Sequence, residues 1–185
     1  NAYGDDEESI YLITSDMKNK YLKQVQKISV NGQENITINK KDIILDSIIS
    51  SDNKIIIVDG YLYCFCIKEN QGVSILKIST NTLELESVVD LVKFDSENNN
   101  DKWYPLSQDS IFYNEEKIYY AILSGEIYSF DIKTNNFIKE FKIEGYNFDV
   151  DSNIRSFYND IYSEIYFLYY ENEASKYSLS TYSLK

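Results

Sequence analysis

Histidine is absent from this chain of 185 residues. Histidine is the commonest general base near neutral pH, a frequent zinc or copper ligand, and the partner of the nucleophile in Ser-His and Cys-His pairs. Glycine-rich phosphate loops and Cys-x-x-Cys motifs are missing too. The sequence therefore argues against activated nucleophiles, nucleotide-binding loops and structural zinc sites. We predict that the protein is not an enzyme.

Cysteine, proline and long apolar runs are scarce as well. Cys64 and Cys66, the two cysteines, stand two residues apart, so on a strand both side chains point to the same face. That geometry is poor for a disulfide, and we expect two small buried thiols. The single proline and six glycines leave asparagine and aspartate to form the turns. No apolar run approaches the length of a membrane span, so we predict no membrane insertion.

Basic residues are outnumbered by acidic residues. Eighteen lysine and arginine residues stand against 30 aspartate and glutamate residues, and the formal net charge is -12. The resulting negative field repels a phosphate backbone and an anionic lipid surface. We therefore expect no nucleic-acid partner.

Aromatic residues are abundant, at 15% of the chain with 18 tyrosines, and tyrosine favours strands. The clearest strand pattern runs from Lys117 to Ile143. It predicts three strands, over 118–123, 126–133 and 137–143, joined by turns at Ser124-Gly125 and at 134–136. The first of these strands is apolar on both faces, which predicts that it is covered on both sides.

A similar pattern recurs about every 50 residues. In the second copy we predict strands over 54–58, 61–68, 72–80 and 83–91, and in the third copy a strand over 110–113 precedes the three described above. Helical periodicity is nowhere sustained over about ten residues. An aliphatic residue followed by tyrosine opens a strand in all four copies, at Ile10-Tyr11, Leu62-Tyr63, Ile118-Tyr119 and Ile165-Tyr166.

A four-stranded meander that repeats at this interval resembles a β-propeller blade, with a period closer to kelch-type than to WD40 blades. The phrase GEIYSFDIKT at 125–134 is similar to the strand and turn of divergent bacterial propellers with quinoprotein-type repeats. The kelch Gly-Gly pair, the WD40 Trp-Asp pair and the quinoprotein cofactor residues have no counterpart here. The resemblance implies an all-β fold, a propeller-like array of about four four-stranded antiparallel meanders, complete or incomplete. The alternative is a twisted β-sandwich.

The repeats predict a single domain over residues 8–185, with copies at 8–45, 46–95, 105–148 and 149–185. We expect residues 1–7 to be a tag remnant and disordered lead-in. The first copy then begins at its second strand, and the fourth copy stops after its third. Unpaired strand edges invite another chain. The pattern therefore predicts a segment of a longer propeller, a small closed ring, or a homodimer through open sheet edges.

Two groups of residues are candidates for sites. Trp103 and Tyr104 lie in the longest connection between strands, where exposed aromatic residues often contact a ligand. The alternative for Trp103 is a lid on the core. Asp149, Asp151 and Asn153 place oxygen ligands at alternate positions, as a calcium loop does, but the expected glycine and glutamate of such a loop are missing. We predict a polar turn and no cofactor, with calcium as the alternative.

Acidic pairs leave a further alternative open, because two carboxylates can hydrolyse a glycosidic bond. The pairs are Glu84 with Glu86, Glu115 with Glu116, and Asp149 with Asp151. We predict instead a non-catalytic binding or scaffolding module with a protein or glycan ligand, in the cell envelope or secreted space of a bacterium. A carboxylate-based glycoside hydrolase or lyase domain, a structural assembly domain and a cytoplasmic location are the alternatives.

Overall fold

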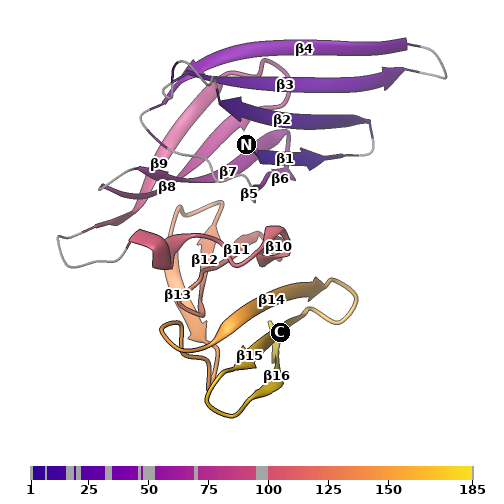
Figure 1. Cartoon of the computed structure of the whole chain (residues 1–185). Helices are drawn as coiled ribbons and strands as arrows, with labels where there is room; N and C mark the ends of the chain where they lie inside the picture. Colours follow the sequence, from indigo (N-terminus) through magenta and orange to yellow (C-terminus); the bar gives the residue numbers. More distant parts are fainter. Residues whose placement is uncertain are drawn as a thin grey trace. The chain divides into compact units, whose positions relative to one another are not determined.

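In the computed structural model, the described residues form sixteen strands and two short 3-10 helices, and none of them forms an α-helix. The chain divides into two compact units, residues 1–98 and 99–185, and each unit contains two of the four sheets (Figure 1). Within the described part, no helix is long and apolar enough to cross a membrane. The structure describes residues 2–6, 8–15, 19, 22–31, 35–45, 47, 53–68, 71–94 and 100–184.

Sheet 1, in unit 1, has the strand order β4-β3-β2-β1-β5. Its strands are β1 (Ala2–Asp5), β2 (Ser9–Ser15), β3 (Leu22–Asn31), β4 (Asn35–Ile44) and β5 (Asn53–Lys54). Neighbours from β1 to β4 are antiparallel, whereas the two residues of β5 pair parallel with β1. The predicted strand over 54–58 is thus divided at Ile55, and its first part joins sheet 1.

β1 corrects the expectation of disorder for residues 2–5, the described strand within the predicted lead-in. Ala2 is buried in the core of unit 1, and all four residues of β1 pair with β2. Gly4 allows a close approach, because a Cβ there would lie 2.5 Å from the carbonyl oxygen of Ile55. The amide of Ile55 donates to the carbonyl oxygen of Tyr3 at 2.6 Å. The first copy therefore does have its first strand. This strand has only four residues, one of them a glycine, so the sequence shows no clear alternation of apolar and polar residues there.

Sheet 2 is the four-stranded meander that the sequence predicts for the second copy. Its strands, in order, are β6 (Ile56–Val58), β7 (Tyr61–Lys68), β8 (Gly72–Ser79) and β9 (Leu85–Lys93). Asp59 and Gly60 form the two-residue turn between β6 and β7, and both have positive φ. The predicted bounds of β7 are confirmed, and its six central residues are buried, as an inner strand requires.

One face of sheet 1 packs against sheet 2 to form the core of unit 1. The prediction of two buried thiols is confirmed by Cys64 and Cys66. Burial raises the pKa of the Cys64 thiol, so this group is protonated at neutral pH. The core includes Tyr11, Ile13, Val25 and Ile43 from sheet 1 and Leu62, Cys64, Leu76 and Ile78 from sheet 2.

Sheet 3, in unit 2, is the meander with the clearest sequence pattern. Two 3-10 helices, η1 (Asn100–Trp103) and η2 (Gln108–Ser110), precede it. Its strands, in order, are β10 (Ile111–Asn114), β11 (Lys117–Ala121), β12 (Glu126–Asp131) and β13 (Phe137–Lys142). The three predicted strands and both turns are confirmed, and Gly125 and Asn135 take the positive φ that such turns use.

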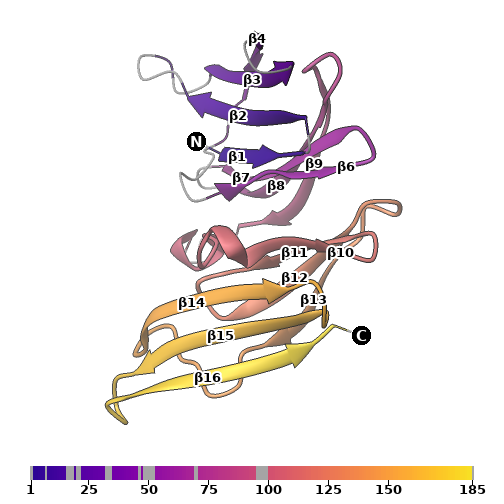
Figure 2. The same cartoon turned by 90° about the vertical axis from the view of Figure 1, so that its right-hand side faces the viewer.

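Sheet 4 completes unit 2 with β14 (Ser152–Asn159), β15 (Glu164–Glu171) and β16 (Lys176–Ser183), side by side in that order (Figure 2). The described part of the fourth copy thus has three strands, as predicted. Ala121 and Ile127 of sheet 3 share a buried core with Ile154, Ile165 and Phe167 of sheet 4. Each unit is therefore a pair of face-packed meanders.

Candidate binding surface

The segment 102–106 carries the two predicted ligand-binding residues and lies along the end of β11 and the turn that follows it. The amide of Leu123 donates to the carbonyl oxygen of Tyr104 at 2.9 Å. The hydroxyl of Tyr120 donates to the carbonyl oxygen of Trp103 at 2.6 Å. The backbone around both predicted residues is therefore fixed to sheet 3.

Trp103 is the first ring of an aromatic ladder on sheet 3, which consists of Trp103, Tyr128 and Phe137. The ring centroids of Trp103 and Tyr128 are 5.1 Å apart, with an interplanar angle of 43°. Those of Tyr128 and Phe137 are 5.0 Å apart, and the two rings are stacked at 10°. All three side chains are half-buried, so each keeps part of its surface in contact with solvent. Trp103 is neither a free loop residue nor a fully buried lid.

The register of β12 and β13 sets the spacing of the ladder. Tyr128 pairs with Lys139, so Phe137 is its diagonal neighbour on β13. Diagonal neighbours on one face of an antiparallel pair are within reach of aromatic side chains. Ile127, the preceding residue of β12, is buried in the core of unit 2. The ladder therefore lies on the face of β12 that points away from this core.

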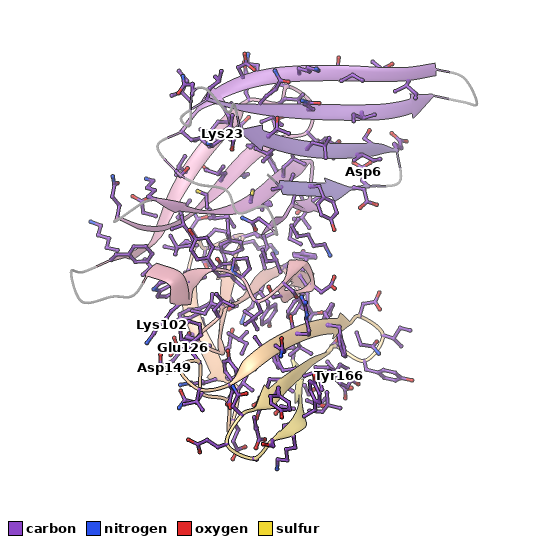
Figure 3. The ribbon with its side chains drawn as sticks, in the orientation of Figure 1. Asp6, Lys23, Lys102, Glu126, Asp149 and Tyr166 are labelled. Carbon is purple, nitrogen blue, oxygen red and sulfur yellow. The ribbon has the colours of Figure 1, made fainter. Side chains whose placement is uncertain are left out.

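Three polar side chains flank the ladder: Ser124, Glu126 and Lys139, here called the polar rim. Oε1 of Glu126 forms an ion pair with Nζ of Lys139 at 3.2 Å. Oε2 of Glu126 accepts hydrogen bonds from the hydroxyls of Ser124 at 3.3 Å and Tyr128 at 3.2 Å. Burial and the adjacent Glu126 carboxylate raise the pKa of Tyr128, so its hydroxyl remains a donor. Figure 3 shows Glu126 on the side of unit 2 where Lys102 lies.

The ladder and the polar rim together place three half-buried rings beside fixed hydrogen-bonding groups, next to Phe130, which lies on the same face of β12 and is buried. Such a surface can hold a ligand through ring contacts and orient it through a few polar groups. Among the residues that the structure describes, no group of three or more Cys, Asp or Glu side chains is arranged to hold a metal ion.

Of the residues predicted as calcium ligands, Asp149 and Asp151 lie before β14, and Asn153 is the second residue of β14. Oδ2 of Asp151 accepts the amide of Asn147 at 2.8 Å, and Oδ1 accepts the amide of Asn172 at 3.3 Å. Asp149 and Asn153 are exposed, and Figure 3 shows Asp149 at the border of unit 2. The Asp151 carboxylate therefore closes the turn by accepting backbone hydrogen bonds. Calcium binding at this turn stays a prediction.

The acidic pairs contact lysines or form turns. Glu84 forms an ion pair with Lys41 at 3.0 Å, between the two sheets of unit 1. Glu115 and Glu116 are the two residues of the turn between β10 and β11, and Glu116 also pairs with Lys133. Glu84 and Glu116 are thus engaged in surface ion pairs with lysines of other strands or turns.

A comparison with protein families decides how the four sheets are to be understood. A family model described as YycP, β-propeller domain, matches residues 1–185. The chain belongs to the YycP β-propeller domain family. The four sheets are the blades of this propeller domain, and the predicted divergent propeller repeat is confirmed.

Two solved structures are similar to the YycP propeller domain in fold. The WD40 domain of SCAP from fission yeast has 16% identity and a TM-score of 0.50, over 99% of this chain and 43% of that one. Prolyl oligopeptidase B from Galerina marginata has 11% identity and a TM-score of 0.48, over 95% of this chain and 25% of that one. The chain spans less than half the length of either, and the likeness to the WD40 domain shows the fold alone. No curated protein matches the sequence.

Of the three rings of the ladder, the sequence pointed only to Trp103. Tyr128 and Phe137 lie on strands that were predicted correctly, but no local feature distinguishes them from the many other aromatic residues of the chain. The signal that could have found them is the register of the two strands, since a tight turn at 134–136 brings both rings to one face. Trp103 joins them through a contact between segments that are distant in sequence.

Proposed function

We propose that this propeller domain is a non-catalytic binding module whose ligand lies across the aromatic ladder of sheet 3. The observation that carries the proposal is the ladder itself, in which half-buried rings from three separate segments are in mutual contact. Tryptophan and tyrosine at fixed positions are the side chains that most often dominate binding energies. Two rings stand on strands and the third on a backbone held to them, so little conformational entropy is lost when a ligand binds.

The polar rim and the net charge narrow the chemistry of the ligand. Glu126 and Lys139 place an acceptor and a donor beside the rings, while the chain carries a net charge of -12. A polyanion is repelled by that charge. A neutral glycan, or an uncharged or basic peptide segment, can cover the rings with apolar surface and reach the polar rim with hydroxyl or amide groups. These two are the ligand classes that we propose.

The absence of catalysis is part of the proposal and is supported by the contacts of Glu126. A general acid must transfer a proton to its substrate. Both carboxylate oxygens of Glu126 instead accept contacts from donors of the protein, and Glu126 is the carboxylate of the polar rim. The sequence also contains no histidine that could act as a base beside the ladder.

The proposal is tested by binding of the full chain to panels of neutral oligosaccharides and of uncharged and basic peptides. Wild type is expected to bind members of one panel. Tyr128→Ala removes the central ring and is expected to weaken binding at least about tenfold, a typical effect for a contact residue of this kind. Tyr128→Phe keeps the ladder and loses only the hydrogen bond to Glu126, so a smaller loss is expected.

Tyr162→Ala is the matched control, because Tyr162 lies in the turn between β14 and β15 with 59% of its surface exposed. It should bind like wild type. Equal losses for the two alanine variants, or no binding to either panel, would contradict the proposal. Mass spectrometry of the bound oligosaccharide or peptide should show it intact after long incubation, and cleavage products would contradict the non-catalytic role.

Location is a further part of the proposal. From the composition we place the module in the cell envelope or secreted space of a bacterium. Fractionation of the producing cells with an antibody against this chain tests the placement, and recovery in the cytosolic fraction alone would overturn it.

A further inference from the structure

β4 is the outermost strand of sheet 1 (Figure 1). It extends over ten residues, Asn35–Ile44, and among the described residues it pairs with β3 alone. The backbone N–H and C=O groups on its other side therefore form an edge. Such an edge is a template for pairing with a further strand, and the longer the strand is, the more bonds it offers.

The side chains along this edge are apolar on one face. Ile43 is buried in the core of unit 1, so the alternate residues of β4 point away from sheet 2. All of these alternate residues are exposed, and Ile44 has the largest exposed fraction, at 79%. They are here called the outer face of β4, which consists of Ile36, Ile38, Lys40, Asp42 and Ile44.

The order of these residues can be tested against pairing of β4 with its own copy. In an antiparallel pair of identical strands, a two-fold axis passes one residue, because opposite residues must lie on the same face. With Lys40 on the axis, Lys40 lies opposite Lys40 of the second copy, and Ile38 lies opposite Asp42. With Asn39 or Ile38 on the axis, the ammonium group of Lys40 lies opposite an isoleucine. These registers place like charges together or place charges against apolar side chains.

One register matches every residue of the outer face that it pairs. With Lys41 on the axis, Lys40 lies opposite Asp42 and Ile38 lies opposite Ile44, and symmetry makes each contact twice. No other axis position from Ile38 to Asp42 gives both kinds of contact. Lys40 and Asp42 are also the only charged residues on the outer faces of β3 and β4, so no further charge disturbs this match.

The same register continues two rows of sheet 1 across the edge. Ile10, Ile28 and Ile38 lie directly opposite one another on β2, β3 and β4, and Leu22 lies opposite Ile44. Once Ile38 meets Ile44 of the second copy, these side chains form one apolar row over both copies. Burial of such surface stabilises association.

The polar row beside it is also prepared for the contact. Nε2 of Gln24 donates to Oδ1 of Asp42 at 2.9 Å, and Nε2 of Gln26 donates to Oε1 of Gln24 at 2.8 Å. The carboxylate of Asp42 is thereby oriented, and its second oxygen can accept from a lysine. Opposite charges on directly opposed residues stabilise an antiparallel pair.

We propose that β4 pairs antiparallel with β4 of a second copy of this chain, with Lys40 opposite Asp42 and Ile38 opposite Ile44. Two copies of sheet 1 then form one continuous sheet. The contact is isologous, so it closes as a dimer and leaves no edge of this kind.

Two charge terms oppose this dimer. Lys41 lies opposite its own copy on the other face, but Nζ of each Lys41 already forms an ion pair with Glu84 at 3.0 Å. Lys23 and Lys27 lie on that face of β3, one strand further from the axis. The net charge of -12 on each copy adds a general repulsion, which about 0.15 M salt screens beyond about 8 Å. Directly opposed residues lie within that distance.

The experiment is sedimentation equilibrium of the full chain at that salt concentration, over a concentration series. Lys40→Asp and Asp42→Lys each replace two attractive contacts by two repulsive ones. Each is expected to raise the dissociation constant at least about tenfold, the equivalent of about 1.4 kcal/mol. Lys93→Asp is the matched control, because it makes the same change of charge at an exposed lysine on β9, the outermost strand of sheet 2. It should associate like wild type.

Mixing the two charge variants gives the decisive result. Across their mixed interface every residue at position 40 has an opposite charge at position 42, so an equimolar mixture should recover the dimer. The double variant Lys40→Asp/Asp42→Lys should recover it as well, and either recovery shows that the substituted chains are folded. No recovery in both cases, or an equal loss in Lys93→Asp, would overturn the proposed register.

A cysteine at the axis tests the geometry independently of charge. Opposed Cα atoms are about 4.5 to 5.5 Å apart, within the range of a disulfide. Lys41→Cys should therefore form a covalent dimer with oxidised glutathione, whereas the two copies of Lys40→Cys are diagonal neighbours at about 7 to 8 Å and should not. The two native cysteines are buried. A wild type that stays monomeric throughout the series would overturn the proposal and assign the two edge lysines to protection against pairing.

Discussion

Gly125 lies against the ring of Tyr146, so closely that a Cβ on Gly125 would stand 2.4 Å from Cδ1 of the tyrosine. The hydroxyl of Tyr146 donates to the carbonyl oxygen of Leu123 at 3.0 Å, and its ring packs edge-on against Tyr169 of sheet 4 at 5.2 Å. Tyr146 thereby fixes the turn between β11 and β12. That turn carries part of the polar rim, so this contact positions the candidate binding surface.

Gly125→Ala is expected to lower the free energy of unfolding by about 2 to 3 kcal/mol, because it adds a clash to a backbone conformation that alanine rarely adopts. Gly60→Ala is the matched control, with the same φ of +78° and its nearest contact at 3.9 Å, from Thr80 Oγ1. The control should cost only about 1 kcal/mol, the cost of the conformation itself. Urea unfolding measures both, and equal losses would show that the tyrosine contact contributes nothing.

Gly4→Ala tests whether β1 is an integral strand of sheet 1. The new Cβ would meet the carbonyl oxygen and the Cβ of Ile55 at 2.5 and 2.9 Å. The two strands must then separate, and we expect a loss of about 1 to 3 kcal/mol, as for other overpacked sites. A thermal melt that is unchanged from wild type would mean that residues 2–5 do not hold sheet 1 together.

Glu115 and Glu116 form a turn that asparagine and glycine fit better. Both have positive φ, 48° and 70°, in a two-residue hairpin turn, the conformation that Asp59 and Gly60 adopt between β6 and β7. Replacing the pair by Asn-Gly is expected to stabilise the protein by about 1 kcal/mol, since each side chain in this region is strained.

The same replacement removes the exposed ion pair between Glu116 and Lys133, which contributes at most about 1 kcal/mol. Lys133→Ala provides the background in which that ion pair is already absent. The gain in stability should be at least as large there as in wild type. A loss of stability in the Lys133→Ala background would contradict the turn argument.

Alkaline pH is expected to destabilise unit 2. Burial, with a contribution from the charge of Asp151, raises the pKa of Tyr146 to about 12, against about 10 in an unfolded chain. The unfolded state therefore loses its proton first, and the stability contributed by Tyr146 is fully present below about pH 10 and is lost as pH rises toward 12. Urea unfolding across this range should show a smaller pH dependence in Tyr146→Phe than in wild type. An identical pH dependence of stability in wild type and Tyr146→Phe would contradict the raised pKa of Tyr146.

The alternation of apolar residues was sufficient to predict most strands of sheets 2 and 3, because both have inner strands that are buried on two faces. The prediction failed where structure depends on close approach rather than on pattern. β1 is held by the small size of Gly4 and by the hydrogen bond that the Ile55 amide donates to the carbonyl oxygen of Tyr3, and neither leaves a periodic signal. Trp103 was recognised as a candidate, but its partners follow from strand register and from a long-range contact.

Trp103 is the single tryptophan of the chain, so its emission reports on the aromatic ladder alone. Titrating the full chain with a neutral oligosaccharide or peptide that binds should shift this emission and protect it from a soluble quencher, with saturation at the affinity found in the binding panels. Tyr128→Ala should abolish the saturable change, and Tyr162→Ala should preserve it. Saturable binding that leaves the emission and quenching of Trp103 unchanged would place the ligand elsewhere and contradict the proposed binding surface.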